Sequence, residues 1–146
     1  AYETCGDTIL TVKELPKNEL LRYGIIDPVE IGKRMKVRSM IEKPKPGTEP
    51  SSYASYGRYL YTPEIFDVLR STASSHKHQG EFTQTEAINL LASQGKVSAL
   101  QFEGTRYDLG EPLGYLISSI KVAMERTEFR ESLIQEMEKL LNSAKY

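Results

Sequence analysis

The sequence predicts an α/β or α+β fold, in which short strands are interspersed with helices. Runs of β-branched and apolar residues are short and end at turn residues, as strands do. Other segments repeat apolar residues at helical spacing. The 146 residues are 39% apolar and 27% charged, so the chain is too apolar to be disordered. One globular domain of strands and helices is therefore expected.

Five segments have the length and composition of strands. In the third, Val37, Ser39 and Ile41 are expected on one face and Met40 on the other. The fourth contains Gly57, and a glycine inside a strand often marks the close approach of another backbone or a ligand. The five segments are residues 8–12, 23–27, 37–42, 53–61 and 97–102.

Four segments have helical signals, such as capping residues and apolar stripes. The polar residues 71–80, between the first two of these segments, are expected to form a loop. The helices are expected after Thr62, from Thr83 or Thr85 to near Gly95, from Glu111, and around residues 129–140.

Charge and cysteine content exclude several classes of protein. The net charge of −1 removes the usual reason to expect nucleic acid or an anionic membrane as a partner. Apolar runs are too short to span a bilayer. Cys5 is the single cysteine, which rules out an intramolecular disulfide and suits a reducing cytoplasm. The first residue is not Met and no signal peptide follows, which suggests a fragment or a processed product.

Glu42, Lys43 and Pro44 stand at the end of a predicted strand. A carboxylate beside an ammonium group, stiffened by proline, could accept hydrogen bonds from sugar hydroxyls and attract a phosphate. The alternative is an exposed ion pair at the end of a strand, which contributes little. Taken alone, the residues favour this alternative.

Two further positions could carry chemistry. Asp108, two residues before Gly110, could hold a hard cation such as Mg²⁺; the alternative is a cap for the helix that begins near Pro112. The backbone amide of Gly24 could donate to a ligand; the alternative is an ordinary turn glycine. For both positions the alternative is favoured by the residues alone.

Six motifs in a particular order favour a functional interpretation of these residues. Together they resemble the second half of the bacterial UDP-glucose pyrophosphorylases, over roughly residues 1–125. The motifs are Glu14-Leu15-Pro16, Arg22-Tyr23-Gly24-Ile25-Ile26-Asp27, Met40-Ile41-Glu42-Lys43-Pro44-Lys45-Pro46, Tyr56-Gly57-Arg58-Tyr59, Gly80-Glu81-Phe82-Thr83-Gln84-Thr85-Glu86-Ala87-Ile88, and Tyr107-Asp108-Leu109-Gly110 followed by Leu113-Gly114-Tyr115.

The resemblance implies the C-terminal portion of a Rossmann-like nucleotidyltransferase fold, an α/β architecture with a mixed sheet and flanking helices. It implies a UTP–glucose-1-phosphate uridylyltransferase, which uses Mg²⁺ to join UTP and glucose 1-phosphate and releases pyrophosphate. The enzyme is expected in the cytoplasm as a homo-oligomer, with no nucleic acid or membrane as partner. Residues 1–125 would form the sugar-phosphate-binding half of the domain, and residues 126–146 a C-terminal helix that could support oligomerisation.

The resemblance also implies roles for individual residues. Gly24 would contact the sugar through its backbone and Glu42 would bind sugar hydroxyls. Lys43 would bind the sugar phosphate, and Asp108 would be the metal ligand; these two are the expected catalytic residues. The expected substrate-binding residues are Gly24, Glu42, Lys43, Ser55 and Gly57.

The sequence departs from the family pattern in two places. The family usually reads Gly-Glu-Ile-Gln-Leu-Thr-Asp-Ala-Ile where this chain has Phe82, Thr83, Gln84 and Glu86, with Gln84 in place of Leu. It often has Asn-Lys where this chain has Glu111-Pro112. The family's glycine-rich nucleotide loop and a second metal-binding Asp are not among these residues. The chain alone is therefore expected to be inactive and to need an N-terminal half, and an isolated half of a sheet is expected to expose an edge.

Three alternatives stay open at this point. The first is a sugar-1-phosphate nucleotidyltransferase that uses dTTP or CTP, since the residues that read the base are not in this chain. The second is a non-catalytic module that binds a sugar phosphate. The third is a structural assembly domain, with the C-terminal helices as the contact.

Overall fold

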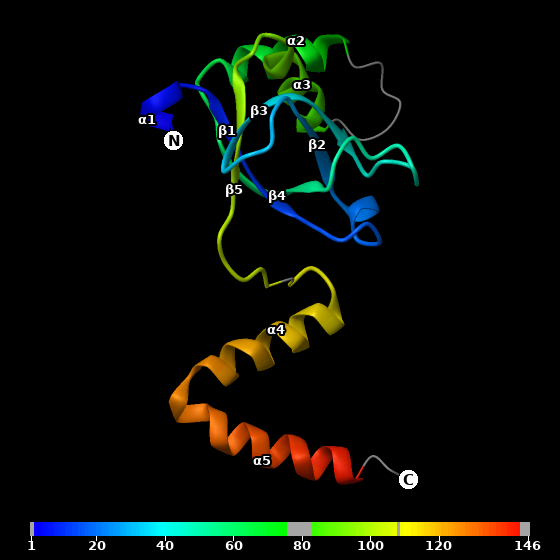
Figure 1. Ribbon diagram of the computed structural model, residues 1–146, viewed down its shortest axis with the longest axis vertical. Helices are drawn as coiled ribbons and strands as arrows, with labels where there is room; N and C mark the ends of the chain where they lie inside the picture. The colour runs from blue at the N-terminus through cyan, green and yellow to red at the C-terminus, as the bar shows by residue number, and fades with distance from the viewer. Residues whose placement is uncertain (1, 76–82, 108, 144–146) are drawn as a thin grey trace. The chain divides into compact units, whose positions relative to one another are not determined.

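The computed structural model describes residues 2–75, 83–107 and 109–143. They form two compact units, Ala1–Glu103 and Gly104–Tyr146. The first unit contains all the strands and the second contains two helices (Figure 1).

The first unit follows the predicted order of elements. The strands lie where the sequence placed them, with ends that differ by a few residues. The elements are α1 (Tyr2–Cys5), β1 (Thr8–Glu14), the 3-10 turn η1 (Leu20–Arg22), β2 (Gly24–Pro28), β3 (Arg34–Glu42), β4 (Tyr53–Leu60), α2 (Ile65–Ser75), α3 (Gln84–Ser93) and β5 (Val97–Gln101).

The five strands form one mixed sheet that closes on itself in the order β1-β4-β2-β3-β5. Strand β1 pairs in parallel with β5, and every other pair is antiparallel. Closure gives each of these strands a neighbour on both sides. The expectation of an exposed sheet edge is therefore wrong for the described residues, because β5 pairs with β3 as well as with β1.

The main core lies between the sheet and the two helices α2 and α3. In Figure 1 these helices lie side by side over one end of the strands, and α3 contacts both β3 and β5. Helix α3 buries Ala87, Ile88, Leu91 and Ala92 against the sheet. The predicted mixed sheet with flanking helices is confirmed. Burial of this apolar face stabilises α3 more than its own propensity does.

Helix α2 continues to Ser75, so the predicted loop at residues 71–80 is wrong for its first five residues, 71–75. The hydroxyl groups of Ser71 and Thr72 donate to Val68 O at 2.8 and 2.9 Å, and Ser74 donates to Arg70 O at 2.8 Å. Back-bonding of this kind lets a polar segment remain helical. Residues 76–80 of the predicted loop lie outside the described residues.

The predicted faces of β3 are wrong at the end of the strand. Met40 is buried, with 2% of its surface exposed, whereas Ile41 is 40% exposed. The β2–β3 register shifts between Asp27, which faces Ser39, and Pro28, which faces Val37. This bulge adds one residue to β3 and reverses the alternation beyond it, so Met40 rather than Ile41 points to the core.

A buried carboxylate ties three strands together at the start of β1. Asp7 Oδ2 accepts hydrogen bonds from Lys36 Nζ of β3 at 2.6 Å and from Ser98 Oγ of β5 at 2.5 Å. Burial opposes ionisation of Asp7, but the bonds from Lys36 and Ser98 outweigh it and lower the pKa of this carboxyl group.

The second unit consists of α4 (Pro112–Glu125) and α5 (Thr127–Ser143). They are separated at Arg126, which has an extended backbone and whose N–H donates to Ala123 O at 3.2 Å. The predicted separation of a helix from Glu111 and a second helix around residues 129–140 is confirmed. No helix in the described part of the chain is long and apolar enough to cross a membrane.

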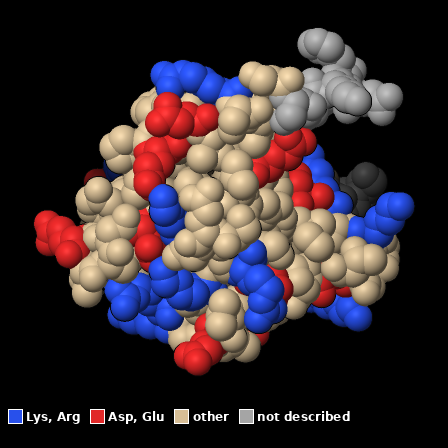
Figure 2. Space-filling view, turned by 90° about the horizontal axis from the view of Figure 1, so that it is seen from above, with Lys and Arg blue, Asp and Glu red and all other residues tan. Residues whose placement is uncertain are grey.

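Acidic and basic side chains alternate around the face shown in Figure 2. Much of the surface between them is uncharged. This distribution agrees with the net charge of −1. Lys and Arg side chains gather at the lower left of that face (Figure 2).

Candidate functional site

Three of the predicted site residues come together where β2, β3 and β4 meet. Gly24 of β2 pairs with Glu42, the last residue of β3. Ile25 of β2 pairs with Ala54 of the antiparallel β4. The next residue of β4, Ser55, therefore lies at the level of Gly24. Antiparallel pairing thus brings Gly24, Glu42 and Ser55 to one end of the sheet.

Gly24 leaves space that the side chains of Glu42 and Met40 occupy. A Cβ atom built at this position would lie 2.7 Å from Glu42 Oε2 and 3.2 Å from Met40 Sδ. Gly24 is not among the described glycines with positive φ, so it is not the turn glycine of the alternative interpretation. The absence of a side chain at Gly24 makes room for the Glu42 carboxylate to lie across β2.

The Glu42 and Lys43 side chains are both exposed. Within the described part of the chain, neither has a hydrogen-bond or ion-pair partner, so the alternative of a strand-end ion pair is not what the structure contains. Both groups are available to a ligand. A carboxylate accepts hydroxyl protons, and an ammonium group attracts a phosphate.

The backbone holds Lys43 in an unusual conformation. Its φ is 45°, and it is the one residue other than glycine with positive φ in the described part of the chain. Its N–H donates to Tyr23 O at 3.1 Å, and Pro44 directly after it is buried. Such conformations cost energy in a non-glycine residue and often occur at functional sites.

The other two predicted substrate-binding residues lie in β4. Ser55 is buried, and its Oγ shares a hydrogen bond of 2.7 Å with Tyr59 Oη. Gly57 lies in a bulge of β4 with a φ of 66°, and a Cβ there would meet nothing within 4 Å. The backbone conformation therefore explains Gly57, whereas the close approach of another group does not.

Asn89 is a site-adjacent residue that the sequence analysis missed. Its Oδ1 accepts a hydrogen bond from Met40 N at 2.7 Å, and its Nδ2 donates to Met40 O at 2.9 Å. One side chain of α3 thus satisfies both backbone groups of a residue in β3. A polar residue between the apolar Ile88 and Leu90 was the signal that could have indicated it.

Asp108, the predicted metal ligand and catalytic residue, lies outside the described residues. The N-cap position of α4 is Glu111, whose side chain makes no capping hydrogen bond. Next to Asp108, Tyr107 Oη donates to Glu125 Oε1 at 2.9 Å, and this bond raises the pKa of the Tyr107 phenol. No group of three or more His, Cys, Asp or Glu that could hold a metal occurs within the described ranges.

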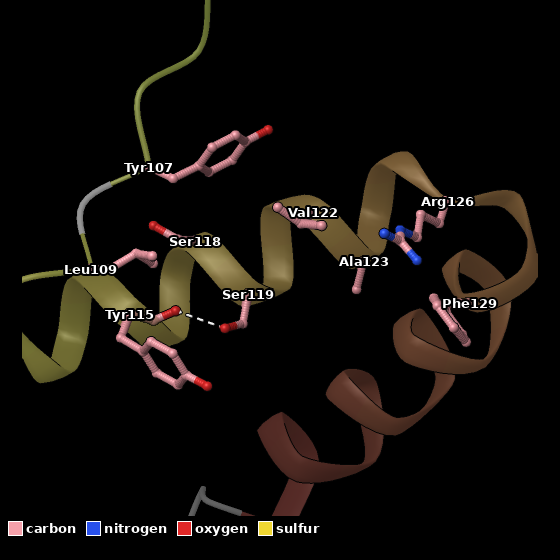
Figure 3. A pocket seen from close by; sticks show the side chains of 9 residues that line it. All are labelled: Tyr107, Leu109, Tyr115, Ser118, Ser119, Val122, Ala123, Arg126 and Phe129. Carbon is pink, nitrogen blue, oxygen red and sulfur yellow. Dashed lines mark hydrogen bonds between the residues drawn. The ribbon is translucent and has the colours of Figure 1, made fainter. Parts of the chain in front are cut away.

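The second unit has a mostly apolar hollow of about 500 Å³. Figure 3 shows its walls, formed by side chains of α4, the preceding segment and the start of α5, with Arg126 as the charged group. The surface that it exposes is mostly apolar, although five of the residues that line it have polar side chains. The hollow is lined by Tyr107, Leu109, Tyr115, Ser118, Ser119, Val122, Ala123, Arg126 and Phe129.

Comparison with known families decides the class of this chain. The sequence pattern of the nucleotidyl transferase family matches residues 2–125. The chain belongs to the nucleotidyl transferase family. Members of this family generally use a divalent metal ion.

Two curated relatives of this nucleotidyl transferase have the same name. The UTP–glucose-1-phosphate uridylyltransferase of Bacillus subtilis is 43% identical over 142 residues, which is 97% of this chain and 48% of the relative. That of Staphylococcus epidermidis is 42% identical over 133 residues, which is 90% of this chain and 46% of the relative. The chain spans about half the length of the curated relatives it matches.

Solved structures agree with the family. A UDP-glucose pyrophosphorylase complexed with UDP-glucose has a TM-score of 0.76 and 31% identity, with 86% of this chain and 47% of that chain covered. A UTP-bound UGPase from Acinetobacter baumannii has a TM-score of 0.80 and 25% identity, with 95% of this chain and 47% of that chain covered. The predicted family resemblance is confirmed.

Proposed function

We propose that this nucleotidyl transferase chain is the sugar-phosphate half of a UTP–glucose-1-phosphate uridylyltransferase. The observation that carries the proposal is the exposed Glu42–Lys43 pair beside Gly24. Similarity to proteins named UTP–glucose-1-phosphate uridylyltransferase supports the choice of substrates. The products would be UDP-glucose and pyrophosphate.

In this proposal the end of the β2–β3 pair binds the sugar phosphate. Glu42 accepts hydrogen bonds from sugar hydroxyls, and Gly24, which is buried in β2 beneath the Glu42 carboxylate, offers a backbone amide with no side chain of its own in the way. Lys43 attracts the phosphate with its ammonium group. Ser55 and Gly57 extend the substrate-binding set along β4, where a buried hydroxyl and an open backbone bulge lie.

The reaction needs no protein nucleophile. A phosphate oxygen of glucose 1-phosphate forms a bond to the α-phosphorus of UTP, and the bond from that phosphorus to the bridging oxygen of pyrophosphate breaks. Positioning and neutralisation of charge are what the protein must supply. Lys43 neutralises charge on the attacking phosphate and holds it in place.

We further propose Mg²⁺ as the metal and Asp108 as the residue that holds it. A carboxylate oxygen is a ligand that Mg²⁺ prefers, and Gly110 nearby leaves space for a phosphate. When bound, the ion supplies charge neutralisation at the phosphates. The remaining ligands would come from the substrates and from the N-terminal half of the enzyme.

The proposal includes the setting of the enzyme. We place it in the cytoplasm, where both substrates are made available by metabolism, and we propose a homo-oligomer with residues 126–146 in the contact. Helix α5 has exposed apolar side chains at Phe129, Leu140 and Leu141. Gel filtration of the enzyme with and without the residues after Glu125 tests the contact, and an unchanged size counts against it.

The test of function compares two proteins. The complete gene product is assayed for UDP-glucose and pyrophosphate formed from UTP, glucose 1-phosphate and Mg²⁺, in parallel with the 146-residue chain alone. We expect turnover from the complete product and none from the chain alone. Turnover with dTTP or CTP in place of UTP would support the alternative base, and binding of glucose 1-phosphate without turnover would support the non-catalytic module.

A further inference from the structure

We propose that Asn89 of α3 is a positioning residue, which sets the place of the Glu42 carboxylate and thereby the affinity for the sugar. The inference rests on the proposed function, because it assigns Glu42 to the sugar hydroxyls. It concerns a side chain that does not touch the substrate. Asn89 acts through the backbone of Met40, two residues before Glu42 in β3.

The geometry of the contact is reciprocal. Met40 pairs with Ile26 across β2 and β3, yet its own N–H and C=O are both bonded to the Asn89 carboxamide, at 2.7 and 2.9 Å. The carboxamide takes the place that a neighbouring strand would occupy. These two hydrogen bonds form an anchor between β3 and α3. The anchor lies directly after the bulge that reverses the alternation of β3.

The anchor lies against the site. Met40 Sδ would lie 3.2 Å from a Cβ at Gly24, and Glu42 Oε2 would lie 2.7 Å from the same point. Met40 and Glu42 thus share one face of β3 and the same neighbour in β2. A shift of the Met40 backbone would move the Glu42 carboxylate across Gly24, where there is little room.

Asparagine is the residue type that this anchor requires. The contact needs one acceptor for Met40 N–H and one donor for Met40 C=O, held on a short side chain. Aspartate keeps the acceptor but turns the donor into a second acceptor facing a carbonyl. Leucine keeps a similar size and removes both bonds, which leaves two half-buried backbone groups without a partner.

The position of the anchor predicts a selective effect. Lys43 is held by other bonds, because its N–H donates to Tyr23 O. The nucleotide is proposed to bind largely outside this chain. Loss of the anchor should therefore weaken binding of the sugar and its discrimination from epimers, and leave the affinity for UTP unchanged.

The experiment uses the complete enzyme with Asn89→Leu and Asn89→Asp. A matched control is Gln84→Leu, which lies on the same helix and loses its bond to Tyr61 Oη but does not touch β3. Steady-state kinetics give KM for glucose 1-phosphate, KM for UTP and the preference over galactose 1-phosphate. Hydrogen exchange, read peptide by peptide, follows the amide of Met40.

We expect Asn89→Leu to raise KM for glucose 1-phosphate about tenfold and to change KM for UTP by less than about twofold. The preference for glucose 1-phosphate over galactose 1-phosphate should decrease. Exchange at Met40 should be faster. Asn89→Asp should have an intermediate effect, and Gln84→Leu should leave both KM values near wild type.

Other outcomes overturn the inference. Faster exchange at Met40 with an unchanged KM for glucose 1-phosphate would make Asn89 a structural residue only. An equal rise in both KM values would indicate general damage to the fold. If the wild-type enzyme has no turnover, the proposed function fails. Calorimetric binding of glucose 1-phosphate then decides the inference, and affinity equal in wild type and Asn89→Leu, or no binding at all, overturns it.

Discussion

The carboxylate of Glu42 lies across Gly24, with Oε2 only 2.7 Å from the point where a side chain of Gly24 would begin. The two residues are directly paired in the antiparallel β2–β3 ladder. Neither residue alone indicates a site, since glycines and exposed glutamates are common. Their pairing explains both, because the glycine leaves the space that the carboxylate occupies beside Lys43.

Gly24→Ala should move the Glu42 carboxylate and weaken sugar binding. The new methyl group would overlap Glu42 Oε2 and press on Met40 Sδ. We expect KM for glucose 1-phosphate to rise about tenfold or more, with a stability loss of about 1 kcal/mol or less, because the flexible ends of Glu42 and Met40 can move aside. Kinetics and urea denaturation of the complete enzyme measure both effects.

Gly32→Ala is the control for this substitution. Its Cβ would make an ordinary contact of 3.6 Å with Arg34 O, in the segment that joins the same two strands. Gly32→Ala should change neither the KM for glucose 1-phosphate nor the KM for UTP. Equal effects of the two substitutions would show that the Gly24–Glu42 contact has no special part in binding.

Lys43→Met should lower kcat/KM without unfolding the protein. The side chain is exposed and has no partner among the described residues, so its removal breaks no internal contact. Loss of one preorganised oxyanion-hole donor costs about 10²–10³ in rate, and we expect a loss of similar size for this ammonium group. Lys45→Met, an exposed lysine in the following loop, is the control and should retain near-normal kcat/KM. Similar losses from both would point to a general effect of positive charge.

The sequence predicted the order and type of most elements because their signals are local. The β-branched run at the start of β1 and the apolar stripe of α3 each occur within about ten residues. Gly24, Glu42 and Lys43 were identified from the resemblance. Their physical relationship follows from strand pairing, which brings together residues that are distant in the sequence.

The errors arose where long-range contacts override local pattern. The bulge opposite Pro28 reverses the alternation of β3. A strict period of two does not anticipate the bulge, so the predicted faces of Met40 and Ile41 were interchanged. Closure of the sheet depends on β5 pairing with β3, which has no local signal. Asn89 is recognisable only once α3 lies against β3. Asp108 stays a prediction.

Asp108→Asn should reduce the Mg²⁺-dependent turnover of the complete enzyme. The amide keeps the size of the side chain but removes the negative charge that a hard cation prefers. We expect a loss of about 10² or more in kcat at low Mg²⁺ concentration, with partial recovery at high concentration. A Mg²⁺ titration measures this. Asp67→Asn, an exposed acid of α2, is the control and should give a wild-type titration; an unchanged titration in Asp108→Asn would exclude Asp108 as a metal ligand.

Tyr61 and Gln84 should be energetically coupled. Tyr61 Oη donates to Gln84 Oε1 at 2.6 Å. Gln84, which replaces the leucine of the family, therefore adds a hydrogen bond between the segment after β4 and the start of α3. A double-mutant cycle with Tyr61→Phe and Gln84→Leu should give a coupling of about 0.5–1.5 kcal/mol by urea denaturation. Burial also raises the pKa of Tyr61 to about 12, so ultraviolet titration of Tyr61→Phe should lose a late-ionising phenol that the wild type has in addition to that of Tyr107. Strict additivity of the two substitutions would refute the coupling.

Asp7 should govern stability in acid. Its folded-state pKa lies below the ordinary aspartate value of 3.8, so its contribution to stability is present above pH 3.8 and is lost as the pH falls through the folded-state pKa. Asp7→Asn should cost about 1–3 kcal/mol at neutral pH, because the bonds from Lys36 and Ser98 are weakened, and should flatten the pH dependence below 3.8. Denaturation of the protein from pH 2 to 7, roughly the window that linkage requires, measures both effects. Glu103→Gln, which breaks only the exposed pair with Lys33, should retain the wild-type curve. If Asp7→Asn keeps the full acid-dependent loss, other carboxyl groups carry it and the network around Asp7 does not determine acid stability.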